Sequence, residues 1–266
     1  RGTEQEKKDL NAAIRNAFKE MDDNIRTNKP ARAKPCCTFI TRIVQDQPPS
    51  FIFTLNQDLF FERYYSWEKA TVFPGLPDHI HLYKQSDPED SSTFRLRLPT
   101  GDQLASRKDE VFRKGFAEIA YVKLHGSQGW LSHDESDAMV MGTQKAALIA
   151  NEPLLRWYFW LFEQVINRPD TRLVVVGYGF RDEHINLCIV NAMKNGLKLY
   201  VISPQLPQDF KNQFIMHEGF NYQVPQGDEL WKGLVQYWPV DLTHFCQPSG
   251  EPNHRGRALF RSLGLT

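Results

Sequence analysis

The sequence predicts an α/β protein built on a parallel sheet. Four β-prone runs are apolar without the alternation of a half-exposed strand, and this is typical of strands covered on both faces. These runs are residues 51–55, 120–124, 172–176 and 198–202. Helical stretches separate them, and residues 172–202 form a strand–helix–strand unit. We therefore expect a Rossmann-like parallel sheet with flanking helices.

The predicted helices follow from apolar periodicity and from their end signals. Residues 5–25 carry an apolar stripe at helical spacing, and a second short helix precedes Pro48 and Pro49. Residues 153–166 are apolar nearly all round, which indicates a buried helix. Residues 182–195 form a further helix that ends before Gly196.

Two segments do not fit the sheet pattern. Residues 64–115 contain several prolines and an acidic polar run, so we interpret them as an insertion, part loop and part small helical subdomain. Residues 247–266 are polar with a few late apolar positions, which suggests a tail or a docking segment. The sheet domain would then span residues 1–246.

Composition excludes several function classes. The 32 Lys and Arg residues balance 32 Asp and Glu residues, so no overall field attracts nucleic acid as a direct partner. A hydrophobic content of 41% is too high for a disordered chain, and no apolar run is long enough to span a membrane. The four cysteines lack a C-x-x-C spacing, which favours reduced cysteines and a cytoplasmic protein.

Polar residues and glycines follow directly after the predicted strands. Open α/β sheets bind ligands at the carboxyl ends of their strands, so these residues are candidates for one site. They are Asn56 and Asp58 after the first run, His125 after the second, Gly177, Tyr178 and Gly179 after the third, and Ser203 after the fourth.

Each candidate has a simpler structural interpretation. Asn56, Asp58 and Asp182 are residue types that cap helices, and a lone histidine is more often packed than catalytic. Gly177 and Gly179 lack the third glycine of a dinucleotide fingerprint. No P-loop, H-E-x-x-H or G-x-S-x-G motif occurs, and His79 with His81 lacks a third ligand, so we expect no metal.

Four ordered motifs resemble sirtuins and their relatives. Residues 54–58 (TLNQD) resemble the T-x-N-x-D segment of sirtuins. Residues 123–127 (KLHGS) with Trp130 resemble a segment of the sirtuin-like domains of bacterial antiphage defence proteins, and residues 176–186 resemble their G-Y-S-F-x-D-x-H-I-N segment. Residues 200–204 are similar to their strand that ends in I-N-P.

This resemblance implies a role for each strand-end residue. His125 takes the position of the catalytic histidine and Asn56 that of the catalytic asparagine. Asp58 matches the acidic residue near the nicotinamide carboxamide, and Thr54 lies at the pocket rim. Gly177 and Tyr178 match the turn beside the adenosine ribose, and Ser203 matches the residue after the next strand.

The implied function is NAD hydrolysis to nicotinamide and ADP-ribose, which would deplete NAD in antiphage defence by abortive infection. A histidine can accept a water or ribose proton, and an asparagine can hold the attacking water. NAD is the substrate, and the resemblance also implies a homo-oligomer with a sensor or ATPase partner or fused domain.

Two departures from the family keep alternatives open. Residues 1–50 contain no glycine-rich phosphate turn, so we expect a first strand and turn to precede Arg1, or phosphate binding to be degraded. Only Cys188 and Cys246 follow His125, so the four-cysteine zinc module of protein deacylases is missing. The alternatives are an NAD-dependent protein deacylase and a non-catalytic nucleotide-binding assembly module.

Overall fold

The computed structural model divides the chain into two compact units, Arg1–Phe159 and Trp160–Thr266. Each unit is described separately below. The structure describes residues 3–28, 33–44, 50–64, 70–72, 74–76, 96–107, 119–142, 144–214 and 224–265.

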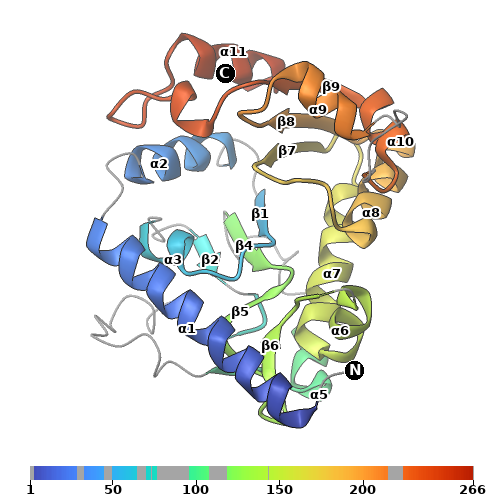
Figure 1. The fold of residues 1–266 in the computed structure, drawn as a ribbon. Helices are drawn as coiled ribbons and strands as arrows, with labels where there is room; N and C mark the ends of the chain where they lie inside the picture. The colour runs from blue at the N-terminus through green and yellow to red at the C-terminus, as the bar shows by residue number, and fades with distance from the viewer. Residues whose placement is uncertain are drawn as a thin grey trace. The chain divides into compact units, whose positions relative to one another are not determined.

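The first unit combines helices with two small sheets (Figure 1). Its elements are α1 (Glu4–Asn28), α2 (Ala33–Val44), β1 (Ser50–Thr54), α3 (Phe60–Tyr64), β2 (Ala70–Val72), β3 (Leu96–Arg97), α5 (Gly101–Ala105), β4 (Ile119–Lys123), β5 (Gly126–Leu131), β6 (Asp137–Met139), α6 (Lys145–Asn151) and the first half of α7 (Pro153–Ile166).

The second unit is built on one sheet with helices around it. Its elements after α7 are β7 (Arg172–Val176), α8 (Glu183–Lys194), β8 (Lys198–Ile202), α9 (Pro207–Phe214), α10 (Gly227–Lys232), β9 (Leu234–Trp238), the 3₁₀ helix η3 (Leu242–Phe245) and α11 (His254–Ser262).

The prediction of an α/β fold with parallel sheets and flanking helices is confirmed. In the first unit β4 lies between β1 and β2, and both neighbours run parallel to it. In the second unit β8 lies between β7 and β9, again with parallel pairing. The four predicted runs are β1, β4, β7 and β8, each within one residue of its predicted bounds.

The central strands of the two parallel sheets are deeply buried. All five residues of β4 are buried, as are the last four of β8. This burial explains the lack of alternation in both runs, because each face of a central strand packs against other elements. Among the described strands, only β6 pairs in an antiparallel sense with its neighbour, β5.

The predicted helices form, with small differences at their ends. The second helix begins at Ala33, so Pro35 lies in its first turn, where proline costs no hydrogen bond. In α1, Leu10 is 61% exposed and Met21 is 38% exposed, so part of its apolar stripe faces solvent. The buried helix α7 and the helix α8 before Gly196 match their predictions.

Much of the predicted insertion at 64–115 lies outside the described residues, including His79 and His81. Its described parts contribute strands to both sheets of the first unit. Here β2 pairs with the central strand β4, and β3 pairs with β5. Part of the segment therefore belongs to the sheets of this unit and is not only an insertion.

The segment 247–266, predicted to be a tail or docking segment, packs on its own unit. Leu259 and Leu263 of this segment are buried, and the Tyr200 hydroxyl donates to the backbone oxygen of Ser262. Tyr200 belongs to the central strand β8, so α11 is anchored to the sheet of the second unit.

The four cysteines form no disulfide. Burial raises the pKa of the Cys37 and Cys188 thiols to about 12, so both stay protonated at neutral pH. Within the part of the chain that the structure describes, no helix combines the length and apolarity needed to cross a membrane.

Gly126→Ala is expected to lower the free energy of unfolding by about 3 kcal/mol or more. Gly126 has a φ of +73°, and a Cβ there would lie 1.9 Å from the backbone oxygen of Ala138. Chemical denaturation of the full chain measures the loss. Gly142→Ala is the matched control, because Gly142 has a φ of +79° but no atom within 4 Å of the added Cβ. Equal losses in both variants would contradict the steric explanation.

Candidate functional site

The carboxyl end of β1 leads into a turn that carries Asn56 and Asp58. The backbone N–H of Asn56 donates to the Thr54 hydroxyl over 3.0 Å, and the Asp58 carboxylate accepts from the backbone N–H of Phe60 over 2.8 Å. The Asp58 contact is an Asx-type bond at the start of α3, which agrees with its interpretation as a helix-start residue. Asn56 itself is exposed.

His125 follows β4 at the position that corresponds to Asn56 after β1. Thr54 and Lys123 are partners in the parallel register, and Asn56 and His125 each lie two residues further along. The backbone N–H of Leu124 donates to the Thr54 oxygen over 2.9 Å. The two predicted catalytic residues therefore leave adjacent strands at the same level of one sheet edge.

Gln57 fixes the turn after β1 to the segment around His125. Its buried side-chain amide donates to the backbone oxygens of His125, over 3.0 Å, and of Val140, over 2.8 Å. Its own backbone oxygen accepts from the N–H of Gln128 over 2.9 Å. These bonds hold the His125 backbone against the turn that carries Asn56, and His125 is only 3% exposed.

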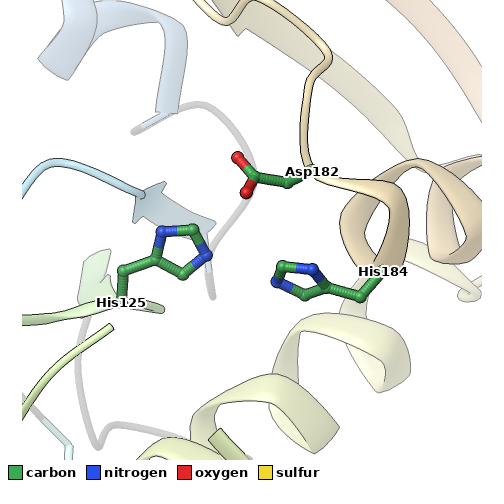
Figure 2. A group of neighbouring side chains, drawn as sticks. All are labelled: His125, Asp182 and His184. Atoms are coloured by element: carbon green, nitrogen blue, oxygen red, sulfur yellow. The ribbon is translucent and has the colours of Figure 1, made fainter. Parts of the chain in front are cut away.

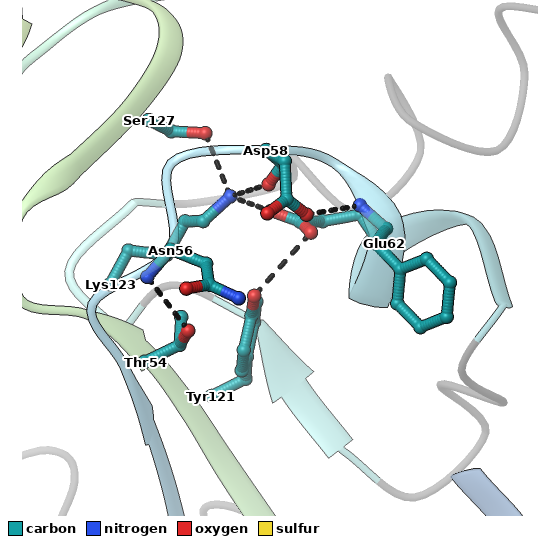
Figure 3. Close-up of polar contacts among 8 residues, drawn as sticks. Thr54, Asn56, Asp58, Glu62, Tyr121, Lys123 and Ser127 are labelled. Carbon is teal, nitrogen blue, oxygen red and sulfur yellow. Dashed lines mark hydrogen bonds and ion pairs between the residues drawn. The ribbon is translucent and has the colours of Figure 1, made fainter. Parts of the chain in front are cut away.

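A buried ion pair lies beneath this sheet edge (Figure 3). Lys123 Nζ lies 2.5 Å from Glu62 Oε1, and the two side chains are 0% and 1% exposed. Lys123 also donates to the Ser127 hydroxyl over 3.0 Å and to the backbone oxygen of Asp58. The Tyr121 hydroxyl donates to the other Glu62 oxygen over 3.4 Å.

Sequence reasoning assigned no role to Lys123, Glu62 or Gln57. One signal was present, because Lys123 lies within an otherwise apolar run that was predicted to be buried on both faces. A lysine in such a run needs a partner, since an unpaired buried charge is very costly. Glu62, the partner, lies 61 residues away along the chain.

Burial and the ion pair act on Glu62 in opposite directions. Removal from water raises the pKa of the Glu62 carboxyl above its ordinary value, and the Lys123 ammonium lowers it. Burial is the larger effect, so the pKa of Glu62 is raised.

In the second unit, the loop after β7 is shaped by two left-handed residues. Gly177 has a φ of +66° and Phe180 one of +53°, and Phe180 is buried among Phe210 and Phe214. The Tyr178 hydroxyl donates over 3.1 Å to the side-chain oxygen of Asn186, which is fully buried. The Asn186 amide donates in turn to the backbone oxygens of Phe180 and Pro225, both over 2.8 Å.

Ser203 follows β8 next to this loop. Val176 and Ile202 are register partners, and the backbone N–H of Gly177 donates to the Ile202 oxygen over 3.2 Å. Gly177 and Ser203 therefore lie at the same sheet edge, each one residue past its strand. Ser203 is buried, and its N–H donates to the Trp238 oxygen over 3.1 Å.

Asp182 and His184 lie at the start of α8 (Figure 2). Asp182 occupies the N-cap position, as its structural interpretation predicts, but its side chain makes no capping hydrogen bond. The ligand atoms of this pair lie within 4.8 Å of one another. Two ligands are fewer than a protein zinc site uses, so the pair alone does not define a metal site. Figure 2 also shows the imidazole of His125, which comes from the first unit.

The structure thus forms two groups from the predicted site residues. Thr54, Asn56, Asp58 and His125 come together in the first unit, at the ends of β1 and β4. Gly177, Tyr178 and Ser203 come together in the second, at the ends of β7 and β8. Each group occupies the sheet edge at which α/β proteins bind ligands.

No family model matches the sequence, and no curated protein matches it.

Lys123→Met should make stability fall more steeply with pH than in the wild type. Without the ammonium, the pKa of Glu62 rises further above its ordinary value of 4.5 in the folded state. The folded protein then favours the protonated carboxyl, so the contribution of Glu62 to stability is greatest below pH 4.5 and falls as the pH rises toward the folded-state pKa. We expect an extra slope of up to about 1.4 kcal/mol per pH unit in that window.

Denaturant unfolding at a series of pH values measures this slope. The double variant Lys123→Met/Glu62→Gln is the control, because it lacks the carboxyl that titrates. Parallel pH curves for the single and double variants would show that Glu62 is not the group responsible.

Proposed function

We propose that this chain is an NAD glycohydrolase that cleaves the nicotinamide–ribose bond to give nicotinamide and ADP-ribose. One observation carries the proposal: Asn56 and His125 follow adjacent parallel strands, each two residues past the register pair Thr54 and Lys123. An amide and an imidazole at one sheet edge suit a hydrolysis that needs an oriented water and a proton acceptor.

The reaction requires few groups. As the bond between nicotinamide and the ribose breaks, its electron pair leaves with nicotinamide and an oxocarbenium-like carbon remains. Asn56 holds the attacking water through its amide donor and acceptor, and His125 accepts the proton that the water or a ribose hydroxyl loses. The new carbon–oxygen bond gives ADP-ribose, and one proton is released overall.

The remaining site residues are assigned by the same resemblance. Asp58 faces the nicotinamide carboxamide in this proposal, and Thr54 lines the rim of the pocket. A carboxylate accepts several hydrogen bonds, so the bond from Phe60 leaves Asp58 able to take another. Gly177, Tyr178 and Ser203 are assigned to the adenosine end of NAD.

The proposal includes a cellular setting. We infer a cytoplasmic protein that forms homo-oligomers and works with a sensor or ATPase, either as a partner or as a fused domain. Activation would deplete NAD and arrest an infected cell. The motifs at residues 123–127, 176–186 and 200–204 support this setting through their likeness to antiphage defence proteins.

Release of nicotinamide from NAD by the full-length protein tests the proposal. We expect His125→Ala and Asn56→Ala each to lower kcat by about 100-fold or more, because each removes a group that acts on the reacting water. His254→Ala and Asn212→Ala are matched controls, since both residues lie in helices of the second unit, outside the proposed site. Undiminished release by the two site variants would refute the assignment.

The same assay separates the alternatives. Removal of an acyl group from a lysine peptide, dependent on NAD, would identify a deacylase instead. NAD binding in calorimetry without turnover, in the full-length protein with its partner, would identify a non-catalytic nucleotide-binding module.

A further inference from the structure

The ammonium of Lys123 makes three hydrogen bonds in a site closed to solvent. Its acceptors are Glu62 Oε1 at 2.5 Å, the Ser127 hydroxyl at 3.0 Å and the backbone oxygen of Asp58. An ammonium has three N–H donors, so these bonds use its full capacity. The Lys123 side chain is 0% exposed and all its N–H donors are used, so it has no donor left for a bound substrate.

The three acceptors belong to three different segments around the proposed active site. Asp58 lies in the turn that carries Asn56, two residues beyond it. Ser127 lies in β5, two residues beyond His125. Glu62 lies in α3, the helix that follows the Asn56 turn. The Lys123 ammonium therefore links the turn that carries Asn56 to the segment that carries His125.

Stability alone does not account for this arrangement. Taking an ammonium and a carboxylate out of water is costly, and their mutual attraction often does no more than offset that cost. Well-packed apolar residues of similar volume would serve a core equally well or better. The charged pair differs from apolar packing in that its hydrogen bonds are directional. Each N–H bond of Lys123 fixes the position of one segment.

We propose that Lys123, held by Glu62, is a positioning residue that fixes the Asn56 turn relative to His125. This inference rests on the proposed function, and it adds a residue that the strand-end motifs do not assign. A small displacement of Asn56 moves the water that it holds, and a shift of about 1 Å can lower a rate by 100-fold. Because Lys123 does not contact NAD, its loss should leave substrate binding largely intact.

The double variant Lys123→Met/Glu62→Gln tests this inference in the full-length protein. It removes both buried charges together, so it avoids the unpaired carboxylate that a single lysine substitution leaves. We expect kcat for nicotinamide release to fall at least tenfold while KM for NAD changes less than threefold. A purely structural role would not separate kcat from KM in a folded protein.

The matched control is Lys232→Met/Asp228→Asn, which removes an exposed ion pair of 3.3 Å in α10. It should leave both kinetic constants unchanged. Ser127→Ala removes one acceptor and keeps the ion pair, so it should lower kcat by a smaller factor. This variant keeps the inference testable if the double variant does not fold.

Hydrogen exchange supplies a readout that does not depend on activity. The amides of Asn56, Phe60 and Gln128 donate hydrogen bonds within or beside the turn. In the double variant we expect them to exchange at least tenfold faster, with the amides of β8 unchanged. Wild-type kcat and wild-type exchange in a folded double variant would overturn the inference while NAD cleavage stands. Faster exchange in a protein that never cleaves NAD would overturn the proposed function alone.

Discussion

The buried pair of Lys123 and Glu62 is the interaction on which the candidate site depends. It lies at the carboxyl end of the central strand β4, where the chain turns toward His125, and it also holds α3 and the turn after β1. Either charge alone would be costly in this position, so the two residues form one unit of structure. The arrangement of Asn56 and His125 follows from this pair and from the bonds of Gln57.

Parallel pairing explains how residues far apart in the sequence reach one place. In a parallel sheet the strands end at the same edge, so the residues that follow β1 and β4 reach one edge, where the buried polar contacts then fix them. The second unit repeats this design with Gly177 and Ser203 after β7 and β8. Its loop is fixed by the buried side chain of Asn186, which holds Tyr178, Phe180 and Pro225. In both units, buried polar side chains therefore fix the loops that follow the strand ends.

Sequence patterns predicted the features that depend on local periodicity. The runs that became β1, β4, β7 and β8 were recognisable because they are mostly apolar and do not alternate, although β1 and β7 are less buried than β4 and β8. Short strands such as β3, with two residues, carry no period and were not predicted. For residues 247–266 the sequence predicted a tail or a docking segment, but it did not show that Tyr200, 62 residues before Ser262, would donate to this segment. The partners of Lys123 were hidden for the same reason, since a single sequence does not state which distant residue balances a buried charge.

The most direct test of the account is a crystal structure of the full-length His125→Ala variant soaked with NAD. This variant retains the strand ends but should not turn the substrate over. The account predicts nicotinamide and its ribose against Asn56 and Asp58, at the carboxyl ends of β1 and β4. NAD bound away from these strand ends, with Asn56 not in contact with it, would contradict the account.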